Sequence, residues 1–178
     1  MKKALLALAL GITSTTTLAA TVATGSIHFF GNVDSGTCRI DIIDNGQPAS
    51  RINMGNVNAA QFSTVGDEAG SRPFGLRLTP GGGCTVPANS VANVTFTSNY
   101  ATPGDTLYSL EPGGAQDLAM VIKDNTGTPI ANGSASKDYP LDATKPTTMI
   151  FTAAYKSIGP AVTAGFANTD VAFIVDIP

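Results

Sequence analysis

Residues 25–33 read Gly25-Ser26-Ile27-His28-Phe29-Phe30-Gly31-Asn32-Val33, and they alternate with the period of two that is typical of a β-strand. The positions on one face are Ile27, Phe29, Gly31 and Val33. That face is apolar, with a single notch where Gly31 has no side chain. Such a notch fits a place where another backbone approaches closely, and a bulge or turn at this point is the alternative.

The other end of the chain has a matching pattern over Asn168–Pro178, which we expect to be the last strand. Its apolar face carries Val171, Phe173, Val175 and Ile177. A closed domain rarely uses both termini as long apolar strands unless these strands pair, within one molecule or between molecules. We expect pairing between molecules. The alternative is that the residues of the first segment fill the sheet of their own subunit.

The chain begins like an exported protein. Met1-Lys2-Lys3 is followed by a short apolar run and then by small residues, which is the pattern of a secretory signal peptide. The apolar run is too short to cross a bilayer as a helix. We expect residues 1–20 to be removed after Ala20, with Ala19 and Ala23 as alternative cleavage points. The mature chain then has 178 − 20 = 158 residues, which suits one domain.

The charge balance argues against nucleic acid as a partner. Without Lys2 and Lys3 the mature chain has 10 − 2 = 8 basic and 13 acidic side chains, a net charge of −5. Nucleic acids and anionic membranes attract basic surfaces instead. Charged residues make up 13% of the chain and hydrophobic residues 43%, so we expect its apolar faces to end up covered.

Sequence signals for catalysis, metal binding or a cofactor are missing. The single histidine, His28, lies in an expected strand with no nucleophile elbow beside it. The run Gly81-Gly82-Gly83 ends in Cys84 and not in the Lys-Ser/Thr of a phosphate loop. We therefore expect no enzyme activity, no metal and no cofactor.

The two cysteines, Cys38 and Cys84, are expected to form a disulfide, because exported proteins fold in an oxidising compartment. The loop between them spans 84 − 38 = 46 residues. In the chain-entropy model such a cross-link contributes roughly 4 kcal/mol. The alternative is a pair of reactive thiols or metal ligands, which the absence of a Cys-x-x-Cys motif disfavours.

Short apolar alternations separated by Gly and Pro turns run through the rest of the chain. The expected strands lie at Cys38–Asp44, Arg51–Met54, Phe74–Leu78, Ala92–Phe96, Asp117–Lys123 and Met149–Tyr155. Residues 62–72 and 99–114 read as loops. Once the signal peptide is removed, no window of eleven or more residues has a helical period. This pattern predicts an all-β fold, either a sandwich or a barrel.

Several motifs near the two ends occur in one order and spacing. The first is Gly25-x-Ile27-x-Phe29-x-Gly31-x-Val33, followed five residues on by Cys38; then come Leu76-x-Leu78 before Cys84, Phe151-x-Ala153-x-Tyr155, Ala167-Asn168, and Asp170-x-x-Phe173-x-Val175. Together they resemble the chaperone–usher pilins, and type 1-like fimbrial subunits in particular. One departure is Ile177, where the family often has a penultimate tyrosine; the isoleucine keeps the apolar phase of the strand.

The resemblance implies an incomplete immunoglobulin-like β-sandwich, the pilin fold, which lacks its seventh strand. It implies a donor-strand extension over residues 21–35 and a pilin domain over residues 36–178. The donor residues are then Ile27, Phe29, Gly31 and Val33, and the acceptor groove lies along Val171, Phe173, Val175 and Ile177. A periplasmic chaperone fills this groove first. At the outer-membrane usher, the extension of the next pilin subunit then replaces the chaperone strand by β-augmentation.

The expected function is that of a structural subunit of an extracellular pilus, or fimbrium, that reaches the cell surface through the periplasm and contributes to cell adhesion. A rod subunit is preferred to a minor tip or adaptor subunit. The rival hypothesis is a self-complete secreted carbohydrate-binding or adhesive β-sandwich. The chain has no Trp and only 7% aromatic residues, which disfavours an aromatic sugar platform. A secreted hydrolase is the third and weakest hypothesis.

Overall fold

The computed structural model describes residues 38–101 and 105–178. The signal peptide and the N-terminal extension expected from the sequence lie outside the described residues. The same holds for the four expected donor positions, Ile27, Phe29, Gly31 and Val33.

The described chain consists of ten β-strands, their connections and one 3-10 turn, η1 (Ala59–Gln61). No helix in this part of the chain is long and apolar enough to cross a membrane. The side chain of Asn58 caps the turn by accepting a hydrogen bond from the Ala60 amide at 3.0 Å. Because the regular structure of the described chain is β-strand apart from this one short turn, the prediction of an all-β fold is confirmed.

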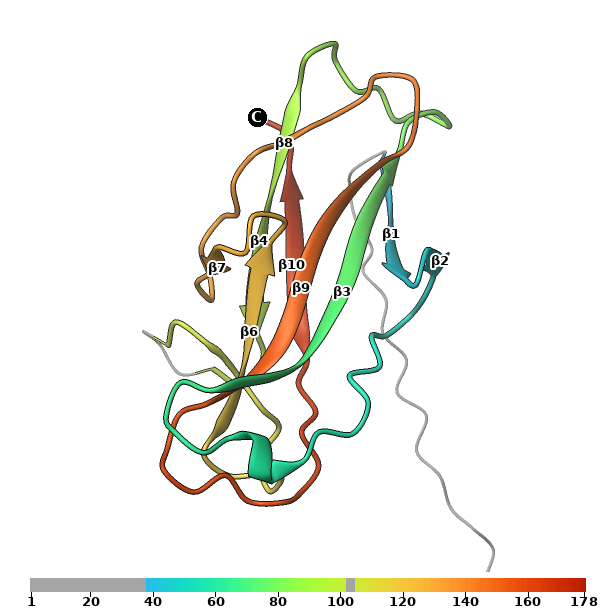
Figure 1. Cartoon of the computed structure of the whole chain (residues 1–178). Helices are drawn as coiled ribbons and strands as arrows, with labels where there is room; N and C mark the ends of the chain where they lie inside the picture. The colour runs from blue at the N-terminus through green and yellow to red at the C-terminus, as the bar shows by residue number, and fades with distance from the viewer. Residues whose placement is uncertain (1–37, 102–104) are drawn as a thin grey trace, which may run out of the picture. The chain divides into compact units, whose positions relative to one another are not determined.

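The strands form two antiparallel sheets (Figure 1). The larger sheet has the order β2-β1-β3-β9-β6-β5, with β7 also paired to β6. Its strands are β1 (Arg39–Asp44), β2 (Gln47–Pro48), β3 (Glu68–Thr79), β5 (Tyr108–Ser109), β6 (Leu118–Asp124), β7 (Pro129–Ile130) and β9 (Thr147–Ser157). The smaller sheet has the order β10-β4-β8, and its strands are β4 (Val91–Ser98), β8 (Tyr139–Pro140) and β10 (Val171–Asp176).

Aromatic side chains from both sheets meet in the core. The Phe96 ring of the smaller sheet contacts the Phe151 ring of the larger sheet edge-to-face, with centroids 5.0 Å apart. Phe74 and Tyr139 lie against the same Phe151 ring, at 5.6 and 5.2 Å. These ring contacts join β3 and β9 to β4 and β8. The two sheets thus pack face to face as a β-sandwich, the architecture that the alternating strands favoured.

The hairpin between β1 and β2 shows how the local sequence sets the fold. Asn45 and Gly46 connect the two strands and both have positive φ, 49° and 78°. A two-residue turn with this backbone matches the twist of antiparallel strands, and Asn-Gly is its preferred sequence. The turn therefore fixes the register of β1 against β2.

One strand and one loop boundary expected from the sequence were wrong. Arg51–Met54 forms no strand, although Met54 still packs against the core. The loop expected over residues 62–72 ends early, because β3 begins at Glu68. The polar residues that look like loop sequence form ion pairs with neighbouring strands. Glu68 pairs with Lys123 of β6 and with Lys156 of β9.

The sequence also missed β5, inside the Pro- and Gly-rich region that reads as a loop. Its Tyr108 is fully buried, and the phenol donates a hydrogen bond to the Ile130 carbonyl oxygen at 3.1 Å. Burial raises the pKa of Tyr108, so the hydroxyl stays protonated as a donor. A strand of two residues, Tyr108–Ser109, is too short to show a period of its own.

Candidate functional site at the edge of the last strand

The last strand, β10, pairs with β4 along one edge only. The ladder has six residue pairs, from Val171 opposite Ser98 to Asp176 opposite Asn93. On its other edge, β10 has no strand partner among the residues that the structure describes. The main-chain N–H and C=O groups of that edge are therefore available to a further strand.

The apolar face of β10 is only half-buried. The four residues expected to form this face do lie on it and pack against the core, and they are Val171, Phe173, Val175 and Ile177. Their neighbours point outward, and Ile174 is 63% exposed.

The adjacent strand β4 shows what complete burial looks like in the same sheet. Phe96 lies directly opposite Phe173, and Val94 lies directly opposite Val175. Phe96 is 3% exposed and Val94 is fully buried. Burial therefore decreases from β4 to β10. The smaller sheet ends at β10, and the apolar side chains on its inner face are only partly covered there.

Half-buried side chains also come from the larger sheet. Ile40 and Ile42 of β1 and Phe74 of β3 contact the core without being enclosed by it. Leu76 and Leu78, the partners of Ile42 and Ile40 on β3, are 1% and 0% exposed. We call the half-buried set the apolar seam; its members are Ile40, Ile42, Phe74, Val171, Phe173, Val175 and Ile177.

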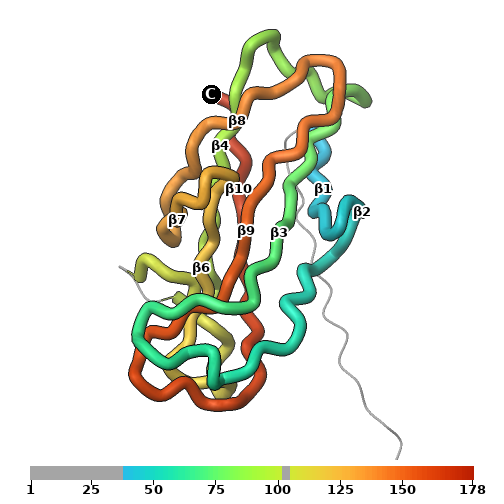
Figure 2. Tube along the Cα trace, viewed as in Figure 1, coloured from blue at the N-terminus to red at the C-terminus, as the bar shows by residue number. Residues whose placement is uncertain are grey.

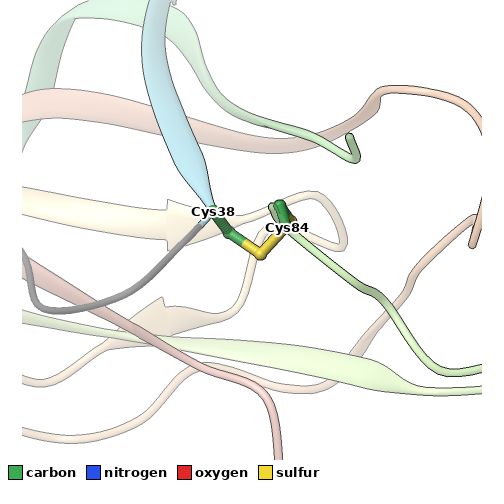
Figure 3. Close-up of a disulfide and its surroundings, with 2 residues drawn as sticks. All are labelled: Cys38 and Cys84. Carbon is green, nitrogen blue, oxygen red and sulfur yellow. A yellow bond between two sulfur atoms is a disulfide. The ribbon is translucent and has the colours of Figure 1, made fainter. Parts of the chain in front are cut away.

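A disulfide holds the start of β1 in place. Cys38 precedes the first residue of β1, and its sulfur bonds to Cys84 just beyond the end of β3 (Figure 3). The S–S distance is 2.00 Å, and neither cysteine is free. The expected Cys38–Cys84 disulfide is thus present in the structure. Cys84 itself is buried and sits in a tight turn, bridged to Gly81.

A shallow cavity of about 380 Å³ lies at the other end of the sandwich, under the loop that leads into β10. Its lining includes Phe62, Leu118, Val162 and Phe166 and carries no acidic or basic side chain. Tyr155 reaches this cavity, and its hydroxyl donates to the Ala167 carbonyl oxygen at 2.7 Å. Burial raises the pKa of Tyr155, which suits a structural donor that holds the loop.

Within residues 38–101 and 105–178, no three His, Cys, Asp or Glu side chains gather closely enough to hold a metal ion. The strongest unusual feature of the described chain is accordingly the apolar seam beside an unpaired strand edge. This arrangement can bind an extended peptide through main-chain hydrogen bonds and alternate apolar side chains.

Comparison with known proteins points to one family. The family model described as "Fimbrial protein" matches residues 27–177. The chain is 33% identical over 178 residues to the probable major fimbrial subunit LpfA of Escherichia coli O157:H7, a match that covers 97% of this chain and 95% of that protein.

Solved structures agree with this. A type I fimbria protein and antigen of Burkholderia pseudomallei, BPSL1626, has 28% sequence identity and a TM-score of 0.58, covering 78% of this chain and 96% of that one. The P pilus rod subunit PapA has a TM-score of 0.58 over 80% of this chain and all of its own, at 19% identity. The likeness to PapA is one of fold alone, and it supports the expected immunoglobulin-like sandwich.

Proposed function

The chain belongs to the fimbrial protein family, and we propose that it polymerises into an extracellular pilus by donor-strand exchange. In this role it is a structural subunit. The N-terminal extension of one subunit, residues 21–35, lies along the free edge of β10 in the next subunit. The donor residues Ile27, Phe29 and Val33 then cover the apolar seam.

The observation that carries this proposal is the half-buried face of β10 beside its unpaired edge. An exposed apolar strand edge invites aggregation unless a partner covers it. A neighbouring copy offers a segment with the same alternation. Because the donor and the acceptor lie on different parts of the chain, the contact is head-to-tail and does not close. Repetition of such a contact produces a filament.

Side-chain volumes favour an antiparallel donor strand. The donor row from Ile27 to Val33 and the acceptor row from Val171 to Ile177 each span six residues, 33 − 27 and 177 − 171. If the rows align antiparallel, Gly31 lies opposite Phe173. Phe29 then lies opposite the smaller Val175. A parallel alignment would place Phe29 against Phe173 and leave Gly31 against Val175. Antiparallel pairs are also slightly more stable for each residue.

The same edge has to be covered before a neighbour arrives. We infer that a periplasmic chaperone supplies a temporary strand and that an outer-membrane usher brings the subunits together. The support is the seam itself, since a free subunit would expose it during export. A fimbrial subunit placed on the cell surface contributes to adhesion through the pilus that it builds.

Gly31→Leu provides a sharp test of the donor segment. The added side chain would meet Phe173 in the antiparallel alignment, so we expect the variant to lose polymer formation. The measurement is the ladder of multimers formed by the mature chain on a gel run without boiling. Ser26→Leu is the matched control, because it adds the same side chain to the opposite face of the same segment. Ladders of equal length from both variants would contradict the proposed packing.

A further inference from the structure

We propose that the end of the domain where β10 begins is a docking surface for the next copy of this chain. The surface is defined by Val65, Ile158 and Phe166, and we call it the loop-end patch. Its partner is the opposite end of the neighbouring copy, where Cys38 and Arg39 lie. This inference rests on the proposed strand exchange and adds a second contact between the same two subunits.

The loop-end patch holds three of the five large hydrophobic side chains that are exposed in the described chain. Val65, Ile158 and Phe166 are 61%, 53% and 48% exposed. Hydrogen bonds fix the loops that carry them. The Gly66 amide donates to the Ser157 carbonyl oxygen at 2.9 Å, and the Ala115 amide donates to the Phe166 carbonyl oxygen at 2.8 Å. An apolar patch on ordered loops is a typical protein-contact surface.

The two loops that carry these side chains gather with the connection between β5 and β6 at one end of the described domain (Figure 2). They connect to β3, β6, β9 and β10 at the ends where β3 and β10 begin. Cys38 lies at the other end, because Arg39 pairs with Thr79, the last residue of β3. The patch and the disulfide are therefore separated by the twelve-residue length of β3.

Chain length decides which end meets the patch. In the antiparallel alignment, Val33 of the donor leaves the seam beside Val171, where β10 begins. Only 38 − 33 = 5 residue steps separate Val33 from Cys38 in the donor's own domain. An extended chain covers at most about 3.6 Å for each residue, about 18 Å in total. The Cys38 end of the donor must therefore lie close to the loop-end patch of the acceptor.

The two ends of the domain differ in charge. The loop end carries four carboxylates without a salt bridge among the described residues, and these are Asp67, Glu111, Asp117 and Asp170. The Cys38 end carries Arg39, whose side chain is 77% exposed and pairs with Asp41, and the exposed Lys145, whose amide donates a hydrogen bond to Asp142. Lys145 lies at the Cys38 end because it precedes β9, whose first residue pairs with Leu78 near the end of β3. The excess of carboxylates at the loop end disfavours contact between two loop ends.

Docking would also limit how far two consecutive subunits can pivot. A five-residue connection alone leaves the domains free to swing about it. A second contact made by apolar side chains fixes one orientation. The loop-end patch would in this way set the angle between neighbours along the pilus.

The test compares Ile158→Lys and Val65→Lys with Ile150→Lys in the full mature chain, residues 21–178. Ile150 is 43% exposed on β9 and lies outside the patch and the seam, so it provides the matched control. Polymer growth is followed by light scattering after refolding. We expect both patch variants to polymerise roughly tenfold more slowly or to dissociate roughly tenfold faster, and the control to match the wild-type chain.

A second measurement separates this inference from strand exchange. Excess peptide copying residues 21–35 is added to each full mature chain, and the melting temperature is recorded. The peptide carries no second domain, so the patch variants should gain the same stability from it as the wild-type chain. Wild-type polymerisation by both patch variants overturns the docking surface alone. A wild-type chain that neither polymerises nor responds to the peptide overturns strand exchange and the docking surface together.

Discussion

At the scale of single residues, one carboxylate organises the turn between β6 and β7. Asp124 Oδ1 accepts hydrogen bonds from the Thr126 amide at 2.8 Å, the Thr128 amide at 3.0 Å and the Thr126 hydroxyl at 2.6 Å. Burial acts to raise the pKa of Asp124, but these hydrogen bonds and the charge of Lys137 outweigh it, so the pKa lies below its usual value. The carboxylate thus contributes stability in its ionised form.

Asp124→Ala should lower the free energy of unfolding by about 1–3 kcal/mol, because two turn amides lose their acceptor. Asp124→Asn keeps an amide oxygen in that place and should cost less. The ionised carboxylate contributes fully above its ordinary pKa of 3.8, and the contribution is lost as the pH falls through the lowered value. Chemical denaturation at pH 7 and at pH 3 measures both effects. A gap between wild type and Asp124→Asn that does not shrink in acid would count against this role.

At the scale of elements, β10 differs from β4, the strand paired with it, because its inward face is not enclosed. Phe173 is half-buried, whereas Phe151 of β9 is fully buried. The energetic value of a core side chain depends on how completely its surroundings close over it. Phe173 should therefore stabilise the domain weakly by itself and strongly once a donor strand covers it.

The variants Phe173→Leu and Phe151→Leu test this difference, because the same Phe-to-Leu change is made at a half-buried and at a fully buried position. In the domain without a donor, we expect Phe151→Leu to be the more destabilising variant, since it leaves a cavity among packed rings. With the donor peptide bound, the loss from Phe173→Leu should grow, while the loss from Phe151→Leu should stay the same. The measurement is the shift in melting temperature with and without peptide. An unchanged effect of Phe173→Leu would show that the seam is not where the peptide binds.

The long strands could be predicted from the sequence because their apolar residues alternate over five or more positions. In β4, Ala92, Val94 and Phe96 alternate and all three are buried. The beginning of β3 escaped prediction for the opposite reason, since Glu68 and Arg72 resemble loop residues until their partners on other strands are known. The two-residue strands β5 and β8 have no period to detect. The apolar face of β10 could be recognised in the sequence from its alternating residues. Its half-burial could not, because burial depends on where the sheet ends in the folded chain.

At the scale of the whole molecule, the fold is a sandwich with one incomplete side. Aromatic rings join the two sheets on the inside, and the disulfide fixes the start of β1. The smaller sheet ends at β10. Three large donor side chains, Ile27, Phe29 and Val33, would contribute on the order of 1.5–3 kcal/mol each before ordering costs. That sum is comparable with the entire stability of an ordinary domain, about 5–15 kcal/mol.

This comparison makes the response to a donor strand the most direct test of the proposed incomplete sandwich. The sample is the chain truncated before Gly36, melted with and without a peptide copying Thr21 to Ser35. A control peptide carries serine in place of Ile27, Phe29 and Val33, which keeps the backbone and removes the apolar row. We expect a large rise in melting temperature and a loss of aggregation with the natural peptide, and neither with the control. If the truncated chain is already monomeric, melts cooperatively and is unmoved by either peptide, its sandwich is complete and the self-contained adhesive domain is the correct description.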